Sequence, residues 1–175
     1  MIAQTLIINR QQIESYNIQL SQSIYDNKLN QLIQEAQFND LRPLLGTRFY
    51  NDILKKISVS DTTYDDLLNG SEYEYMNETY FNYGLRIVLS YYTFARWSMF
   101  GDITDTPFGQ TKRTNTELET PLTIAEKKQA YNNNQNIAWN YWLSVKDFLN
   151  RNYKDYELYD TCLRQKPKFK LYKLG

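Results

Sequence analysis

Few side chains in this sequence of 175 residues are suited to catalysis. The chain contains no histidine, so its one cysteine, Cys162, has no imidazole base to activate the thiol. General acid–base catalysis would therefore depend on carboxylates. Six acidic residues lie between positions 61 and 78 with no basic residue among them: Asp61, Asp65, Asp66, Glu72, Glu74 and Glu78. Because this stretch is rich in turn-forming residues, we expect a solvated acidic contact face and no catalytic residue.

The same counts argue against a bound metal or cofactor. Zinc and haem sites draw on histidine and cysteine ligands, so we expect neither a metal site nor a cofactor. A single cysteine allows no internal disulfide, and a reducing compartment is the expected setting. The N-terminal sequence MIAQTLIINRQQ lacks the features of a secretory signal, and no apolar run approaches the roughly 20 residues of a membrane span. We therefore predict that the chain is not an enzyme and has no membrane partner.

A second charge cluster lies at the C-terminus. Residues 164–175 contain five basic residues and no acidic one. The basic and aromatic side chains of this tail are Arg164, Lys166, Lys168, Phe169, Lys170, Tyr172 and Lys173. Three roles are open: contact with the phosphates and bases of nucleic acid, a solubilising terminus, or docking on an acidic protein surface. Twenty basic and twenty acidic residues cancel over the whole chain, which argues against a general nucleic-acid binder and favours docking.

A threonine-rich stretch, residues 101–122, separates two helical patterns. An active-site lid would have no evident site to cover, so an extended hairpin, a strand that pairs with another subunit, or a disordered surface loop remain. The candidate intersubunit residues are Thr106, Pro107, Phe108, Gly109, Lys112 and Arg113.

Helical periodicity predicts four helices that would position these clusters, over residues 23–38, 47–57, 78–100 and 123–152. The third is apolar on nearly every face, so we expect it to be the central helix. Arg42 precedes a proline and should be extended or in a turn. Gly46 is expected in a left-handed turn, with Thr47 capping the next helix.

These elements predict an all-α fold, a small bundle of about four helices with an extended loop and an extended C-terminal arm. The expected organisation is an N-terminal arm (1–22), a helical bundle domain (23–153) that contains the loop 101–122, and a basic tail (154–175). Within the N-terminal arm, Asn9 should cap a short helical turn that ends at Glu14. Asn69 and Gly70 form a good turn pair.

Four sequence features follow one another in a recognisable order. They are EAQFNDLRPLLGTRFYNDIL, YDDLLNGSEYEY, the aromatic helix YFNYGLRIVLSYYTFARW, and a TPFGQTKRTN loop followed by a long helix and a basic tail. This order resembles the head–tail connector (adaptor or head-completion) proteins of tailed bacteriophages, most closely the version found in phages of Bacteroidetes, including crAss-like ones. The resemblance covers roughly residues 24–170.

The resemblance implies a structural virion protein without enzymatic activity. Such proteins form a ring, usually of twelve copies, between the portal and the tail. The implied partners are copies of the chain, the portal protein, tail or neck proteins, and packaged DNA in the lumen without sequence-specific contact. The implied location is the neck of the virion, after a period in the host cytoplasm. A ring needs heterologous contacts, which the unequal charges of the acidic stretch and the tail would suit. The alternative function is a small DNA-binding module that uses the basic tail; an enzyme of unknown type is the third reading.

Overall fold

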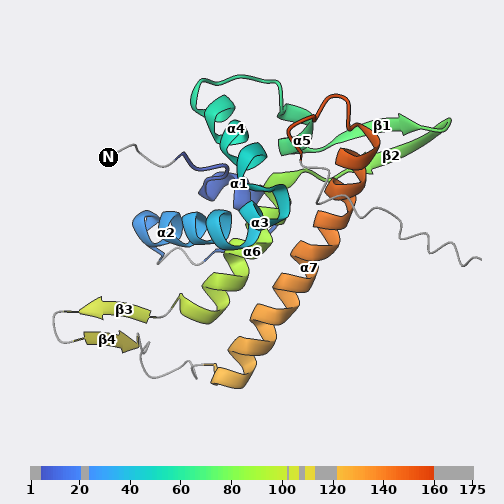
Figure 1. The fold of residues 1–175 in the computed structure, drawn as a ribbon. Coiled ribbons are helices and arrows are strands. Elements are labelled where there is room, and N and C mark those ends of the chain that lie inside the picture. Colours follow the sequence, from blue (N-terminus) through green and yellow to red (C-terminus); the bar gives the residue numbers. More distant parts are fainter. Residues whose placement is uncertain (1–4, 21–23, 102, 107–108, 113–121, 160–175) are drawn as a thin grey trace, which may run out of the picture.

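A central helix organises the fold of this protein. The computed structural model describes residues 5–20, 24–101, 103–106, 109–112 and 122–159. Helix α6 (Leu85–Phe100) passes through the middle of the molecule, with α7 (Ile124–Arg151) packed along it and α2 (Asp26–Ala36) crossing it (Figure 1). As the apolar sequence predicts, α6 buries seven side chains and is the core helix of the structure.

The remaining elements surround this centre. In chain order they are α1 (Arg10–Ser15), η1 (Gln37–Leu41), α3 (Arg42–Leu45), α4 (Thr47–Ser58), α5 (Asp65–Asn69), β1 (Ser71–Tyr75), β2 (Glu78–Asn82), β3 (Ile103–Thr106) and β4 (Gly109–Lys112). Two predicted helix starts are confirmed by their caps. Asn9 forms a capping box with Gln12 at α1, and Thr123 forms one with Glu126 at α7.

The prediction of an all-α bundle of about four helices is wrong. The described residues contain two antiparallel β-hairpins, β1–β2 and β3–β4, which makes the fold mixed. They also contain six helical segments when the continuous run from α2 through η1 to α3 counts as one. The two hairpins lie at opposite ends of α6, since β2 precedes that helix and β3 follows it (Figure 1).

The hairpin β1–β2 replaces the first turns of the helix predicted over 78–100. Its strands pair from Ser71 with Asn82 to Tyr75 with Glu78. The chain reverses at Met76 and Asn77, whose φ values of 53° and 64° are those of a tight hairpin turn. Aromatic residues occur on strands as readily as on helices, and the helical pattern of α6 masked the alternation of the strands.

A π-helical turn carries the chain through Pro43, where an extended conformation was expected. The Arg42 N–H donates to the carbonyl of Gln37, five residues earlier, and Arg42 has helical φ and ψ of −55° and −42°. In a regular α-helix, the ring of Pro43 would collide with the carbonyl group one turn earlier. The wider π-helical turn moves this carbonyl group, so the helix continues through Pro43. Gly46 has the expected positive φ, 79°, and itself occupies the cap position predicted for Thr47.

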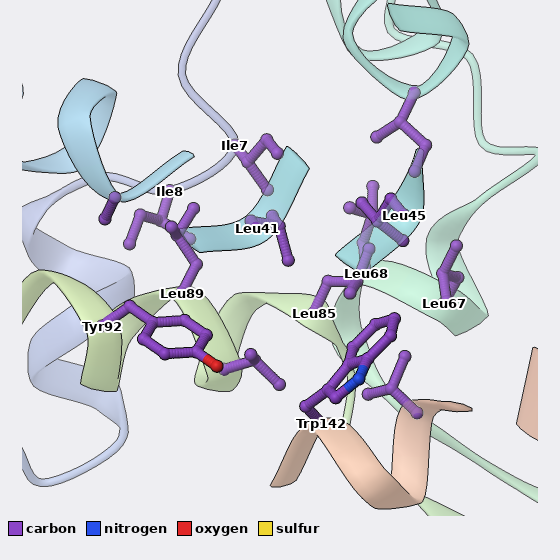
Figure 2. Packing of buried hydrophobic residues seen from close by; sticks show 14 of the residues in the cluster. Ile7, Ile8, Leu41, Leu45, Leu67, Leu68, Leu85, Leu89, Tyr92 and Trp142 are labelled. Atoms are coloured by element: carbon purple, nitrogen blue, oxygen red, sulfur yellow. The ribbon is translucent and has the colours of Figure 1, made fainter. Parts of the chain in front are cut away.

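One hydrophobic core joins the helices to the N-terminal arm. Figure 2 shows side chains of this core: Ile7, Ile8, Leu41, Leu45, Leu67, Leu68, Leu85, Leu89, Tyr92 and Trp142. Ile7 and Ile8 come from the segment before α1, so the arm is part of the core. Trp142 is the buried tryptophan of α7 and points toward Leu68 and Leu85 (Figure 2).

The buried side chain of Gln37 holds this arm in place. Its Oε1 accepts a hydrogen bond from the Ile7 N–H at 2.7 Å, and its Nε2 donates to the Thr5 carbonyl at 3.2 Å. Gln37 is fully buried in η1, so these bonds satisfy polar groups that water cannot reach. The arm is therefore fixed both by two isoleucines and by one amide.

Replacing Gln37 with leucine should lower the free energy of unfolding by about 2 kcal/mol, because the Ile7 N–H then remains buried without an acceptor. Urea denaturation followed by circular dichroism measures this loss. Gln31→Leu is the matched control, since Gln31 is exposed on α2 and should change stability by less than about 0.5 kcal/mol. Equal stability of the Gln37 and Gln31 variants would show that the amide does not hold the arm.

Buried tyrosines make the fold sensitive to alkali. Tyr92 and Tyr156 are 4% and 6% exposed, and burial raises the pKa of each phenol to about 12. Nearby carboxylates, Asp40 for Tyr92 and Asp66 for Tyr156, add to the effect. The folded state therefore keeps a proton on each phenol in a range where the unfolded chain, with an ordinary pKa near 10, releases it.

The contribution of these two phenols to the free energy of unfolding should accordingly be constant below about pH 10 and fall as pH rises toward 12, with a slope of up to about 1.4 kcal/mol per pH unit for each phenol. Urea titrations at several pH values between 8 and 12 would measure the slope. Tyr92→Phe and Tyr156→Phe should each flatten it, whereas Phe81→Leu, which changes no titratable group and lies at a 57% exposed position, should not. An unchanged slope in both buried variants would contradict the assignment.

Candidate docking surface

The three predicted clusters fall on different parts of the chain. The tail residues 164–173 lie outside the described residues, as do Pro107, Phe108 and Arg113 of the loop. Thr106 is on β3, and Gly109 and Lys112 are on β4. Of the three alternatives left open for this loop, the structure shows the hairpin, because β3 and β4 pair with each other from Ile103–Lys112 to Thr106–Gly109; an intersubunit role stays a prediction. All six acidic residues are described.

Asp61 does not belong to the acidic face. Its carboxylate forms an ion pair with Lys56 at 2.6 Å and accepts a hydrogen bond from the Thr63 N–H at 2.8 Å. The pKa of Asp61 lies well below its usual range, mainly because of the hydrogen bond from the Lys56 ammonium and, to a smaller extent, because of the hydrogen bonds from Thr63. These contacts close the loop after α4, so the charge of Asp61 is compensated inside its own segment.

The other five carboxylates share one region of the surface. Asp65 and Asp66 begin α5, Glu72 and Glu74 lie on β1, and Glu78 begins β2. All five are exposed, and none of them forms an ion pair with another described residue. We call these five residues the acidic face. A protein surface with several uncompensated charges of one sign favours a partner of the opposite sign.

The hairpin β1–β2 presents two different sides. Side chains alternate along a strand, so Tyr73, Tyr75 and Tyr80 share one side with Glu78. The opposite side carries Glu72, Glu74, Thr79 and Phe81, all of them exposed. The tyrosine side, which also carries Glu78 of the acidic face, faces α7, and the side with Glu72 and Glu74 faces away from it.

Arg151, at the end of α7, anchors the tyrosine side. Its guanidinium lies over the ring of Tyr80, 3.8 Å from the centroid, and 4.9 Å from the centroid of Tyr75. Its Nη1 donates to the Tyr73 hydroxyl at 3.2 Å, and Tyr73 meets the edge of Phe148 at 5.1 Å between centroids. Cation–π contacts of this kind stabilise a partly exposed hairpin. The sequence showed no signal for this contact, since Arg151 and Tyr73 are 78 residues apart.

The two edges of the hairpin differ in their contacts. At the β2 edge, the Ser144 hydroxyl of α7 donates to the Phe81 carbonyl at 2.8 Å. At the β1 edge, the described residues provide no hydrogen-bond partner for the backbone of Glu72 or Glu74 outside the hairpin. Among the described residues, α7 therefore contacts the β2 edge at Phe81, and none contacts the backbone of the β1 edge at Glu72 and Glu74.

Aromatic side chains continue the surface from β2 onto α7. Phe81 and Tyr83 are 57% and 53% exposed. Tyr83 meets the edge of the Tyr141 ring at 5.3 Å, and Tyr141 stacks on Tyr91 of α6 at 5.5 Å. Exposed aromatic residues beside a charged region are typical of protein–protein interfaces.

The described part of the chain offers little for other kinds of chemistry. It contains no group of three or more histidine, cysteine, aspartate or glutamate side chains that is arranged to hold a metal ion. Among its helices, none combines the length and apolar character that crossing a membrane requires. The described residues form a candidate docking surface: an acidic strand whose outer edge they leave free, next to exposed aromatic rings.

Comparison with known proteins gives one match. The model of DUF6712, described as a family of unknown function, matches residues 41–168. That range includes both hairpins, α6, α7 and the acidic face. No curated protein and no solved structure matches the chain.

Proposed function

Because the chain belongs to the DUF6712 family, whose function is unknown, we propose a function from its own residues: it is a structural virion protein that forms an oligomeric connector ring between the portal and the tail of a tailed bacteriophage. The order of motifs from EAQFNDLRPLLGTRFYNDIL to the basic tail suggests this class of protein. The role requires no catalysis, only stable contacts between copies and with the portal.

The observation that carries the proposal is the pair of hairpins at opposite ends of α6. A subunit of a ring must present two different surfaces, one for each neighbour, and these surfaces must be complementary. The acidic face on α5 and β1–β2 is separated from β3–β4 by the length of α6, which has 16 residues and so extends about 24 Å. A hairpin at each end of a subunit suits such contacts, because an exposed strand edge can pair with a strand of a neighbour.

Closure of a ring makes weak contacts sufficient. Each copy would add one contact to each neighbour, and the last contact forms within the assembly at high effective concentration. Charged and aromatic contacts of modest strength then allow a subunit to exist alone before assembly and to remain bound afterwards.

The decisive experiment combines this chain with the portal protein encoded by the same phage genome. We expect rings containing many copies by native mass spectrometry, on a portal assembly, and density for the chain in the neck of virions by electron microscopy. A chain absent from purified virions would overturn the proposal. Tight binding of duplex DNA that weakens steeply as salt increases would instead identify the alternative, a DNA-binding module that uses the basic tail.

A further inference from the structure

The outward edge of β1 is left open by the described residues and has the geometry to accept another strand. A two-residue turn with positive φ at Met76 and Asn77 makes Tyr75 and Glu78 a hydrogen-bonded pair. Hydrogen-bonded and non-hydrogen-bonded pairs alternate along an antiparallel ladder. Glu72 and Glu74 belong to non-hydrogen-bonded pairs, so their backbone N–H and C=O groups point away from β2. The Phe81 carbonyl, opposite Glu72, points outward in the same way and is bonded to Ser144. The edge at Glu72 and Glu74 therefore has donors and acceptors in place, and the described residues leave them without a partner.

The side chains at this edge specify what a partner strand should carry. Glu72 and Glu74 are on the outward side and are exposed. Tyr73 and Tyr75 alternate with them and are on the side held by Arg151. A complementary strand would place basic residues at alternate positions on one side and apolar residues on the other, because neighbouring strands align side chains of the same face.

The C-terminal sequence has this pattern. From residue 166 it reads Lys-Pro-Lys-Phe-Lys-Leu-Tyr-Lys. In an extended strand, Lys166, Lys168 and Lys170 would lie on one side, and Phe169 and Leu171 on the other. The segment thus offers lysines at the two-residue spacing of Glu72 and Glu74, with apolar residues at the spacing of Tyr73 and Tyr75.

We propose that residues 166–173 of a neighbouring copy add as a strand to the free edge of β1, with Lys168 and Lys170 beside Glu72 and Glu74. This inference rests on the proposed ring and deepens it by naming the two surfaces that meet. Backbone hydrogen bonds would supply affinity, and the alternating charged and apolar sides would fix the register.

The contact is head-to-tail, which is what a ring requires. Each copy has one acidic edge and one basic segment, so a copy that donates its tail to one neighbour still has its edge free for another. The described chain ends at Tyr159, packed against Phe49 on the side of the molecule that carries α5. The donated segment begins a few residues later.

A peptide experiment tests the strand contact without requiring a ring. The acceptor is the full chain carrying Lys168→Glu and Lys170→Glu, labelled with nitrogen-15, and the probe is a synthetic peptide of residues 164–175. We expect peptide binding to shift the amide resonances of Glu72 and Glu74. Adding Glu72→Lys and Glu74→Lys to the acceptor should weaken binding by at least about tenfold, because attraction becomes repulsion.

Two proline variants of this acceptor separate edge pairing from general charge attraction. Glu74→Pro removes an outward N–H from the β1 edge, and Thr79→Pro removes the outward N–H of its partner on β2. Only Glu74→Pro should abolish peptide binding. In proline variants whose amide spectra show an intact hairpin, binding that both prolines weaken equally, or that neither weakens, would overturn strand addition, and so would a peptide that does not bind. The lysine variants at the exposed positions 72 and 74 preserve the test should both prolines disturb the hairpin.

A mixing experiment tests whether the contact is between copies. One chain carries Glu72→Lys and Glu74→Lys with a native tail, and the other carries Lys168→Glu and Lys170→Glu with a native hairpin. Native mass spectrometry should show pairs of the two chains, or larger assemblies that contain both, only after mixing, because each tail is then complementary to the hairpin of the other chain and not to that of its own kind. Peptide binding without such pairs would show that each tail occupies its own hairpin and would overturn the proposal. Rings on the portal that Glu74→Pro leaves intact would also overturn it, while the connector role would stand.

Discussion

A Gly84→Ala chain is expected to unfold with a free energy at least about 3 kcal/mol lower than the native chain, combining positive-φ strain and backbone collision. Gly84 has φ +87° at the junction of β2 and α6, in a region that residues with a Cβ rarely adopt. A Cβ at this position would approach the Gly70 nitrogen to 2.6 Å and the Leu68 carbonyl oxygen to 2.7 Å. Both contacts are with backbone, which cannot rotate away. The entry to the hairpin from α5 and its exit to α6 therefore cross too closely for any side chain.

Urea denaturation would give the loss, with Thr79→Ala as the control on the same hairpin. Thr79 is exposed and should cost less than about 0.5 kcal/mol. The Gly84 variant should also bind the tail peptide less well, because the hairpin must move to relieve the collision. A Gly84→Ala chain as stable as the Thr79 control would mean that the crossing is looser than the structure shows.

Phe49→Ala should lower the free energy of unfolding by about 3–5 kcal/mol. Phe49 is fully buried, and its ring is the common neighbour of three tyrosines: Tyr64 at 5.5 Å, Tyr156 at 6.3 Å and Tyr159 at 5.9 Å between centroids. Removing the ring leaves a cavity and breaks the attachment of residues 152–159 to α4. The segment that leads to the tail would then lose its anchor.

Thermal or urea denaturation of Phe49→Ala measures this effect, and two further variants show whether it is specific to the cavity. Phe49→Leu should cost less, because it fills part of the space. Phe81→Ala removes the same side chain from a 57% exposed position and should cost less than about 1 kcal/mol. A similar loss in the Phe49 and Phe81 variants would contradict the role of Phe49 as the centre of the cluster.

Sequence reasoning located the long helices well, because their periodicity and caps are local. The expected helix over 123–152 and the observed Ile124–Arg151 differ by one residue at each end, and Thr123 is its cap. Sequence reasoning failed where tertiary contacts determine the local backbone conformation. The turn at Met76 and Asn77 lacks the glycine that usually marks such hairpins, and Pro43 is usually a helix breaker.

The candidate surface was predicted in part. Charge counting identified Asp65, Asp66 and the three glutamates, but it could not separate Asp61, whose partner Lys56 comes from the preceding helix. The free edge of β1 could not be predicted from the sequence either, since it depends on strand pairing and on Ser144 of a distant helix. The resemblance to connector proteins suggested a role in assembly, and the structure added the residues with which that role can be tested.

Helix α7 has 28 residues, yet its five buried side chains all belong to the half from Ala138 onward. Residues 124–137 are held by the Thr123 cap and by partly exposed contacts such as Asn134 with Ser98. Asparagine lowers helix propensity, and four asparagines fall in this half. The two halves should therefore open on different timescales: amide hydrogens of the first half should exchange with solvent through local fraying, and those near Trp142 only when the whole molecule unfolds.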